Sequence, residues 1–143
     1  MLKKTIEYVD YDGNKRKEDF YFNLTKSELA QLELSVEGGI TKKIIEIAQK
    51  QDVPQMLKFF KLFIEKSYGE KSDDGKYFRK SPERFADFES TEAYNQLILS
   101  LMESPDETVK FFTAIFPEDM QKQIAEDANK NPELAAMMKQ NNA

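Results

Sequence analysis

Three pairs of neighbouring carboxylates could in principle serve acid–base catalysis or bind magnesium, because two such groups can share a proton or a divalent cation. They are Asp73/Asp74, Glu118/Asp119 and Glu126/Asp127. Each pair falls in an expected loop or on the polar face of an expected helix. Acidic residues in such places are ordinarily solvated. We therefore expect surface positions and neither a catalytic nor a metal site.

The segment from Asp10 to Asn14 resembles the start of a calcium-binding loop, with Asp10, Asp12 and Asn14 at alternate positions. The full motif needs a glycine at its sixth position and a glutamate at its twelfth. Lys15 and Tyr21 stand at those two positions. The segment is therefore interpreted as a tight turn.

Other catalytic chemistry is largely excluded by composition, because the chain contains no cysteine and no histidine. Thiol nucleophiles, disulfides, imidazole bases and the usual zinc and haem ligands are thereby absent. Gly38-Gly39 is not followed by the Lys and Ser/Thr of a phosphate-binding loop and is expected to end a helix. We expect no enzyme, no cofactor and no metal.

Length and charge indicate one domain with interspersed acidic and basic residues. The chain has 143 residues and a formal net charge of −5. Residues 71–84 interleave basic residues with Tyr77 and Phe78, but acidic residues dilute this patch, so we expect a solvated loop or small hairpin and no nucleic-acid site. No apolar run could span a bilayer and no export signal is present, which predicts a cytoplasmic protein without a membrane partner.

The most apolar element is an expected helix over residues 54–68, PQMLKFFKLFIEKSY. Its large apolar side chains fill about half of the helical circumference. A surface helix needs less apolar area than this. Either neighbouring helices cover the surplus or part of it binds a partner.

An N-terminal β-hairpin is predicted from the alternation of apolar residues over 2–9 and 15–24. A two-residue loop would place apolar residues on both faces. A three-residue loop with Gly13 in the left-handed conformation, followed by a bulge, places them on one face. We expect the second arrangement.

Capping motifs and apolar periodicity predict the helices that follow the hairpin. Besides 54–68, the expected ranges are 26–36, 40–51, 82–88, 92–103, 105–116, 118–129 and a last helix after Asn131-Pro132. The predicted fold is mainly α, an N-terminal hairpin followed by a compact bundle of about six to eight short helices. Residues 1–117, with the hairpin at 1–24, form the expected single α-rich domain. Residues 118–143 form a polar helical C-terminal segment, loosely docked or flexible.

Apolar surplus on the helices and methionines in the polar C-terminal part suggest a binding surface, since methionine is frequent on adaptable interfaces. For the phenylalanines, core packing is the competing interpretation. The centre of helix 54–68 is assigned to the core and its rim to a partner. The expected partner-binding residues are Phe59, Leu62, Phe111, Ile115, Met120, Met137 and Met138.

Several stretches of the sequence, in order, resemble the tail assembly chaperones of bacteriophages with long, non-contractile tails. They are DYDGNKRKEDFYFNLTKSELAQLEL (10–34), the diglycine at 38–39, YGEKSDDGKYFRKSPE (68–83) and FESTEAYNQLILSL (88–101). The resemblance covers roughly residues 2–117 and involves no catalytic signature.

This resemblance implies a non-enzymatic scaffold in the host cytoplasm. It would bind and solubilise the helical tape-measure protein and be absent from the finished virion. The family's longer, frameshifted products add a domain that recruits tail-tube protein, and this chain is expected to be the short form, with tube protein as a further partner left open. Self-association is also expected, because a coat that must be displaced works through many weak contacts. The alternative is a small structural or adaptor protein of the tail or head–tail connector.

Overall fold

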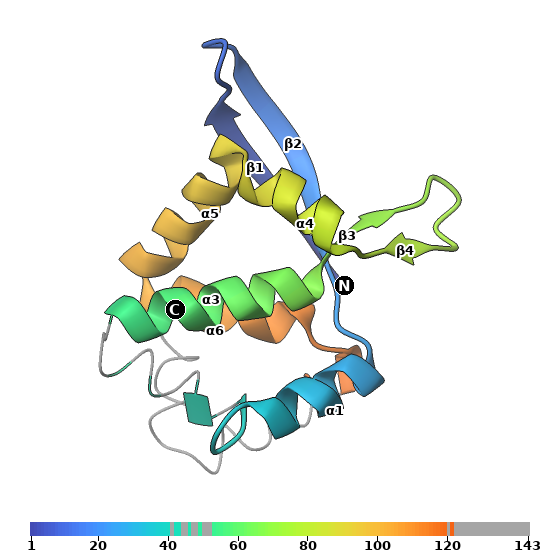
Figure 1. The fold of residues 1–143 in the computed structure, drawn as a ribbon, viewed down its shortest axis with the longest axis vertical. Coiled ribbons are helices and arrows are strands. Elements are labelled where there is room, and N and C mark those ends of the chain that lie inside the picture. Colours follow the sequence, from blue (N-terminus) through green and yellow to red (C-terminus); the bar gives the residue numbers. More distant parts are fainter. Residues whose placement is uncertain (41, 44–45, 47–48, 50–52, 120, 122–143) are drawn as a thin grey trace.

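The structure is a computed structural model, and it describes all residues except 41, 44–45, 47–48, 50–52, 120 and 122–143. Four strands form one antiparallel sheet in the order β1-β2-β3-β4 (Figure 1). They are β1 (Leu2–Val9), β2 (Lys15–Phe22), β3 (Tyr68–Lys71) and β4 (Phe78–Arg79). The helices are α1 (Lys26–Ser35), α3 (Val53–Ser67), α4 (Pro82–Glu89), α5 (Glu92–Glu103) and α6 (Pro105–Ile115).

The predicted fold class, a hairpin followed by a bundle of six to eight helices, is wrong. In the described part of the chain, five helices accompany a four-stranded sheet. The difference arises because β3 pairs with β2, through Tyr21 opposite Gly69 and Phe22 opposite Tyr68. This pairing joins segments far apart in the sequence, and β3 is too short to show an alternating pattern.

The N-terminal hairpin has the predicted loop. Asp10 donates its backbone N–H to the carbonyl of Asn14 at 2.9 Å, and Gly13 donates to the carbonyl of Asp10 at 3.0 Å. Gly13 and Asn14 thus both bond to Asp10, as in a bulge that begins with glycine. Gly13 has φ +83°, a conformation that glycine adopts without strain. The resulting register places Leu2, Ile6, Tyr8, Phe20 and Phe22 on the same face.

The helix starts confirm the predicted caps. Thr25 accepts a hydrogen bond from the Glu28 backbone N–H, while the Glu28 carboxylate accepts one from the Thr25 backbone N–H, which completes a capping box. Ser81, Thr91 and Ser104 cap α4, α5 and α6, where each side chain accepts one hydrogen bond from a backbone N–H of the first turn.

The helix expected over 54–68 runs from Val53 to Ser67, and the chain passes directly into β3 at Tyr68. Gly69 has no room for a side chain, since a Cβ there would lie 2.6 Å from the Phe78 ring. Glycine at this position therefore allows Phe78 to cover the start of β3. The helices expected over 40–51, 118–129 and after Pro132 lie partly or wholly outside the described residues.

The hydrophobic core lies where the helices meet each other and the inner face of the hairpin. Helices α3 and α6 are in contact through their aromatic rings, and α4 and α5 lie beside the hairpin (Figure 1). Ile6 and Phe22 bring the hairpin into the core at 6% and 0% exposure. Hairpin and helices therefore share one apolar interior.

Candidate partner-binding surface

The aromatic side chains of α3 and α6 pack against each other around Phe112. This ring lies 5.5 Å from Phe59, 5.5 Å from Phe60 and 4.5 Å from Phe63, measured between ring centroids. Phe112 itself is fully buried. Tilted and edge-to-face rings at these distances attract each other in addition to burying apolar area. The two helices are therefore held together by a continuous aromatic seam.

Three of the predicted partner-binding residues lie within the core. Phe59, Phe111 and Ile115 have exposed fractions of 3%, 4% and 0%. Phe111 packs on Phe22 of the hairpin at 5.3 Å between ring centroids. These side chains offer almost no surface to a partner in this conformation. Their binding role stays a prediction.

Leu62 is the predicted residue that retains some exposure, since it is partly buried against the core. Met120, Met137 and Met138 lie outside the described residues. The structure thus groups Phe59, Phe111 and Ile115 in one core. It does not place them with Leu62 on a shared surface.

Other large apolar side chains are exposed where no binding residue was predicted. On α3, Val53 and Leu57 are 45% and 39% exposed, and they lie one helical turn apart. Leu34 on α1 and Leu99 on α5 are 89% and 50% exposed. The apolar half-circle of α3 already included Leu57. The helical pattern could have identified Val53 and Leu57 as an edge of the apolar face. It did not show which edge of that face is exposed to solvent.

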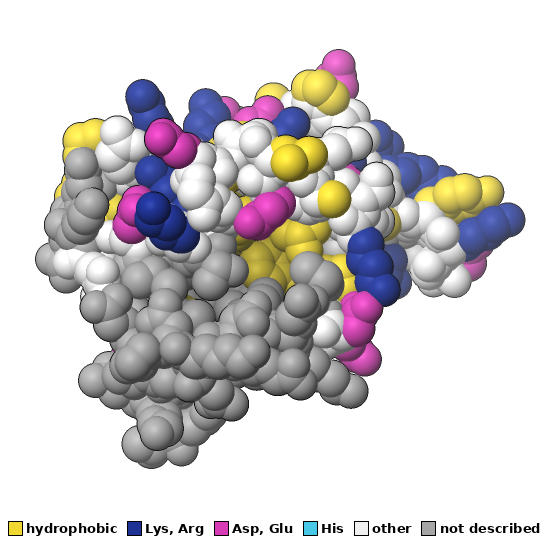
Figure 2. Space-filling model, turned by 90° about the horizontal axis from the view of Figure 1, so that it is seen from below, with side chains coloured by type: hydrophobic (Ala, Val, Ile, Leu, Met, Phe, Trp, Pro, Cys, Tyr) yellow, Lys and Arg dark blue, Asp and Glu magenta, His cyan; other side chains and the backbone are white. Residues whose placement is uncertain are grey.

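Charged side chains do not gather into a patch of one sign on the face that Figure 2 shows. Basic and acidic side chains are interspersed there, and hydrophobic side chains reach the surface between them (Figure 2). Such a surface favours neither nucleic acid nor a strongly charged partner. Apolar contact is the better-supported mode of binding for this face.

The β3–β4 hairpin forms its own set of contacts. The Tyr77 ring has Lys76 Nζ at 5.3 Å and the Arg79 guanidinium carbon at 5.0 Å from its centroid. Asp74 accepts hydrogen bonds from the Ser72 hydroxyl and the Lys76 backbone N–H. The cations near Tyr77 are thus engaged with the ring that a stacked base would need. The expected small hairpin is confirmed.

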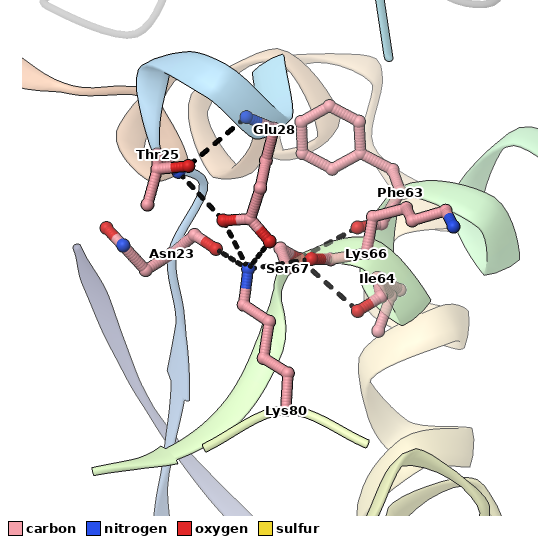
Figure 3. Close-up of polar contacts among 8 residues, drawn as sticks. All are labelled: Asn23, Thr25, Glu28, Phe63, Ile64, Lys66, Ser67 and Lys80. Atoms are coloured by element: carbon pink, nitrogen blue, oxygen red, sulfur yellow. Dashed lines mark hydrogen bonds and ion pairs between the residues drawn. The ribbon is translucent and has the colours of Figure 1, made fainter. Parts of the chain in front are cut away.

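A second set of polar contacts joins four segments at Lys80, as Figure 3 shows. Its ammonium donates to the carbonyls of Asn23 at 2.7 Å and Lys66 at 2.9 Å. It also bonds both carboxylate oxygens of Glu28, at 2.9 and 2.8 Å. The node links the end of β2, the start of α1, the end of α3 and the residue after β4. We call these contacts the Lys80 node.

The charge of Glu28 is stabilised within the Lys80 node. Burial by itself would raise the pKa of this carboxyl, but hydrogen bonds from Lys80 and the Thr25 backbone N–H, with the positive charge of Lys80, outweigh it. The pKa of Glu28 is therefore lowered on folding. A lowered pKa means that ionised Glu28 stabilises the folded state above the ordinary pKa of glutamate. This contribution is lost as the pH falls through the lowered value.

We predict that the stability difference between the wild-type protein and Glu28→Gln depends on pH. Urea unfolding should show the wild type to be more stable at about pH 7, with the difference shrinking as the pH falls below the ordinary pKa of glutamate and Glu28 is protonated. Glu37→Gln is the control, since Glu37 is exposed. A difference that stays constant across this range would contradict the assigned role of the Glu28 charge.

The candidate calcium segment is a turn stabilised by its own residues, as predicted. The Asp10 carboxylate accepts hydrogen bonds from the backbone N–H groups of Asp12 and Asn14 and from Arg16 Nε at 2.6 Å. The bond from Arg16 is the main cause that lowers the pKa of Asp10. Its oxygens are thus engaged within the turn. Among the described residues, no group of three or more acidic side chains is placed to hold a metal ion.

Two open depressions in the described surface are lined mainly by charged and polar residues. One, of about 500 Å³, lies between the hairpin and Gln96 of α5, and the other, of about 470 Å³, lies at the β3–β4 turn. No helix in the described ranges is long and apolar enough to cross a membrane.

Comparison with protein families gives a match over the whole chain. A family model described as phage tail assembly chaperone matches residues 1–143. No curated protein and no solved structure matches the chain.

Proposed function

This chain belongs to the phage tail assembly chaperone family, and we propose that it binds and solubilises the tape-measure protein while the tail is being built. The single observation that carries the proposal is the family match over all 143 residues. The proposed role is non-enzymatic, is performed in the host cytoplasm, and ends before the virion is complete. Self-association and contact with tail-tube protein belong to the same proposal.

The exposed apolar rim of α3 supports a binding mode for a helical client. An amphipathic helix binds through side chains that recur every three or four residues, and it needs an apolar strip of matching spacing. Val53 and Leu57 are spaced in this way and are partly exposed. We propose that one face of a tape-measure helix packs on this α3 rim, defined as Val53 and Leu57. Leu62 is on the opposite edge of the buried face of α3, five residues from Leu57, and stays a prediction of a separate contact.

Weak binding at the α3 rim suits a chaperone that must later release its client. Two half-exposed side chains bury little apolar area, so each subunit contributes a small part of the total affinity. Many subunits along one client would bind it strongly through multivalency, and each could still be displaced singly. Deep grooves are therefore unnecessary for this function.

Partner binding by Phe59, Phe111 and Ile115 would require the core to open, with α6 leaving both α3 and the hairpin, because Phe59 packs on Phe112 and Phe111 packs on Phe22. We retain it as a prediction of an opened state. For Met120, Met137 and Met138, the proposal is that they add flexible apolar contacts to the same client.

We predict that the double variant Val53→Asp/Leu57→Asp loses its chaperone function. Co-expressed wild-type chain should keep the tape-measure protein in the soluble fraction, and the double variant should leave it as insoluble as without any chaperone. Carboxylates at these positions would have to be desolvated against an apolar client face. Sedimentation of the lysate followed by quantitative blotting of the client gives the measurement.

Leu34→Asp on α1 is the matched control, since it adds the same charge at another exposed leucine. It should retain wild-type function. A client that precipitates equally with and without the wild-type chain would overturn the proposed function. If the double variant is as active as the control, the α3 rim is not the binding surface, while the proposed function still stands. Mass spectrometry of purified virions should find no copies, and many copies would indicate an adaptor protein.

A further inference from the structure

The outer edge of β1 presents backbone groups that have no partner among the described residues. β1 is a terminal strand of the sheet, with β2 on one side. Asp10 and Asn14 form a hydrogen-bonded pair, so alternation in an antiparallel ladder directs the even-numbered residues of β1 toward β2. The odd-numbered residues Lys3, Thr5 and Glu7 then direct their N–H and C=O groups to the free edge. Their side chains are exposed.

A free edge of this length can add another strand, because unpaired backbone groups bind an extended segment through ladder hydrogen bonds. β1 has eight residues. Lysines often protect such edges by repulsion, and β1 contains Lys3 and Lys4. Here, however, Glu7 lies four residues after Lys3 on the same face. A second, antiparallel β1 can therefore place its Glu7 opposite Lys3 and neutralise the lysine charge.

We propose that two copies of this chain associate through β1, which pairs antiparallel with β1 of the second copy about a two-fold axis at Thr5. In this arrangement Thr5 lies opposite Thr5 of the second copy, and Lys3 lies opposite Glu7 of the second copy. The two-fold axis generates a second, equivalent Lys3–Glu7 pair, so two Lys–Glu pairs form. The two sheets join into one continuous antiparallel sheet.

Charge complementarity selects this register. The free backbone groups belong to odd-numbered residues, so these must pair with odd-numbered residues of the second copy. The possible registers then differ in which residue of β1 lies at the two-fold axis. With the two-fold axis at Lys4, Lys4 would lie opposite Lys4 of the second copy. With the axis at Glu7, Glu7 would lie opposite Glu7 of the second copy. With the axis at Ile6, Lys3 would lie opposite Val9. Opposite charges directly across a ladder stabilise it, and like charges destabilise it.

The side chains at the free edge can accept the second copy. Within the described part of the chain, the Glu7 carboxylate makes a long contact with Lys17 Nζ, at 3.7 Å, and the two side chains are 76% and 70% exposed. Glu7 can therefore turn to Lys3 of the second copy at little cost. The other face would place Leu2 opposite Tyr8 of the second copy, an apolar pair in the closely spaced, non-hydrogen-bonded type of position.

This inference assigns a surface to the self-association that is part of the proposed function. It concerns the chain alone and leaves the α3 rim free. A test of dimer formation without the client can therefore fail while client binding is confirmed. Client binding can likewise fail while dimer formation is confirmed.

Charge reversal tests the pairing on the full-length chain by sedimentation velocity over a range of concentrations. The wild type should reach a dimer of twice 16.7 kDa. Lys3→Glu and Glu7→Lys should each be monomeric where the wild type is dimeric, because every cross-copy pair becomes repulsive. An equimolar mixture of the two variants should form a heterodimer, since one variant carries carboxylates at both positions and the other carries ammonium groups at both.

A backbone variant gives an independent readout. Thr5→Pro removes an N–H that points away from β2 and one exposed side-chain bond, from Thr5 to Asp19, while every ladder bond between β1 and β2 remains, so the hairpin should stay folded by circular dichroism and the dimer should be lost. A wild type that is monomeric at every concentration would overturn the proposal. So would a dimer that survives both charge reversals and Thr5→Pro, or a mass beyond the dimer that these variants leave unchanged.

Discussion

Phe112→Ala is expected to lower the free energy of unfolding by about 3–5 kcal/mol, the range for removing a buried phenyl ring. The ring is fully buried and contacts Phe59, Phe60 and Phe63 of α3. Its removal would leave a cavity in the seam between α3 and α6 that rigid neighbours fill poorly. Since small domains are stable by about 5–15 kcal/mol, this loss is a large fraction of the total.

Urea unfolding followed by far-ultraviolet circular dichroism measures this change at neutral pH. Leu99→Ala is the control, because Leu99 is half exposed on α5 and its truncation should change stability by less than about 0.5 kcal/mol. Equal losses for the two variants would show that the aromatic seam does not hold the fold together.

Lys80→Met should destabilise the protein by about 2 kcal/mol, because hydrogen bonds to charged groups each contribute about 1.5–3 kcal/mol. The variant leaves the carbonyls of Asn23 and Lys66 and the Glu28 carboxylate without their shared donor. Water can reach Glu28, whose side chain is 38% exposed, and this limits the loss. Methionine keeps the apolar stem in place.

The control for the Lys80 node is Lys58→Met, an exposed lysine on α3 that should tolerate the same replacement. Combining Lys80→Met with Glu28→Gln should cost less than the sum of the single variants, since the two side chains act on each other. Strict additivity of the two free-energy changes would mean that Lys80 and Glu28 are not coupled.

Helix starts were predictable because their signals are local. The capping box at Thr25 and Glu28 and the serine–proline starts before α4 and α6 lie within a few residues of the bonds they form. The hairpin loop was predictable for the same reason, since Gly13 and the alternation of apolar residues together left one arrangement with a single apolar face.

The complete sheet could not be predicted from such signals. Tyr68 carried the helical periodicity one residue too far, whereas α3 ends at Ser67, whose hydroxyl bonds back to the Phe63 and Ile64 carbonyls. The strand that follows is short, contains Gly69 and is half polar. Its pairing with β2 depends on the tertiary contacts that bring the two segments together, which no local pattern records.

The sequence could not distinguish binding residues from core residues, for a related reason. Helical periodicity shows that Phe111 and Ile115 are on an apolar face, but it does not show what covers that face. In the structure the hairpin supplies part of the cover, through Phe22 against Phe111. The exposed rim at Val53 and Leu57 depends equally on where neighbouring elements end.

The pairing of β2 with β3 also sets an order of events during synthesis. β1 and β2 are local partners and can form a hairpin as soon as they leave the ribosome. The second edge of β2, however, waits for residues 68–71, which are made after α1 and α3. During that interval the nascent chain carries two open strand edges, a state prone to misassociation. Translation speed between residues 23 and 71 should therefore influence how much of this protein reaches its folded state.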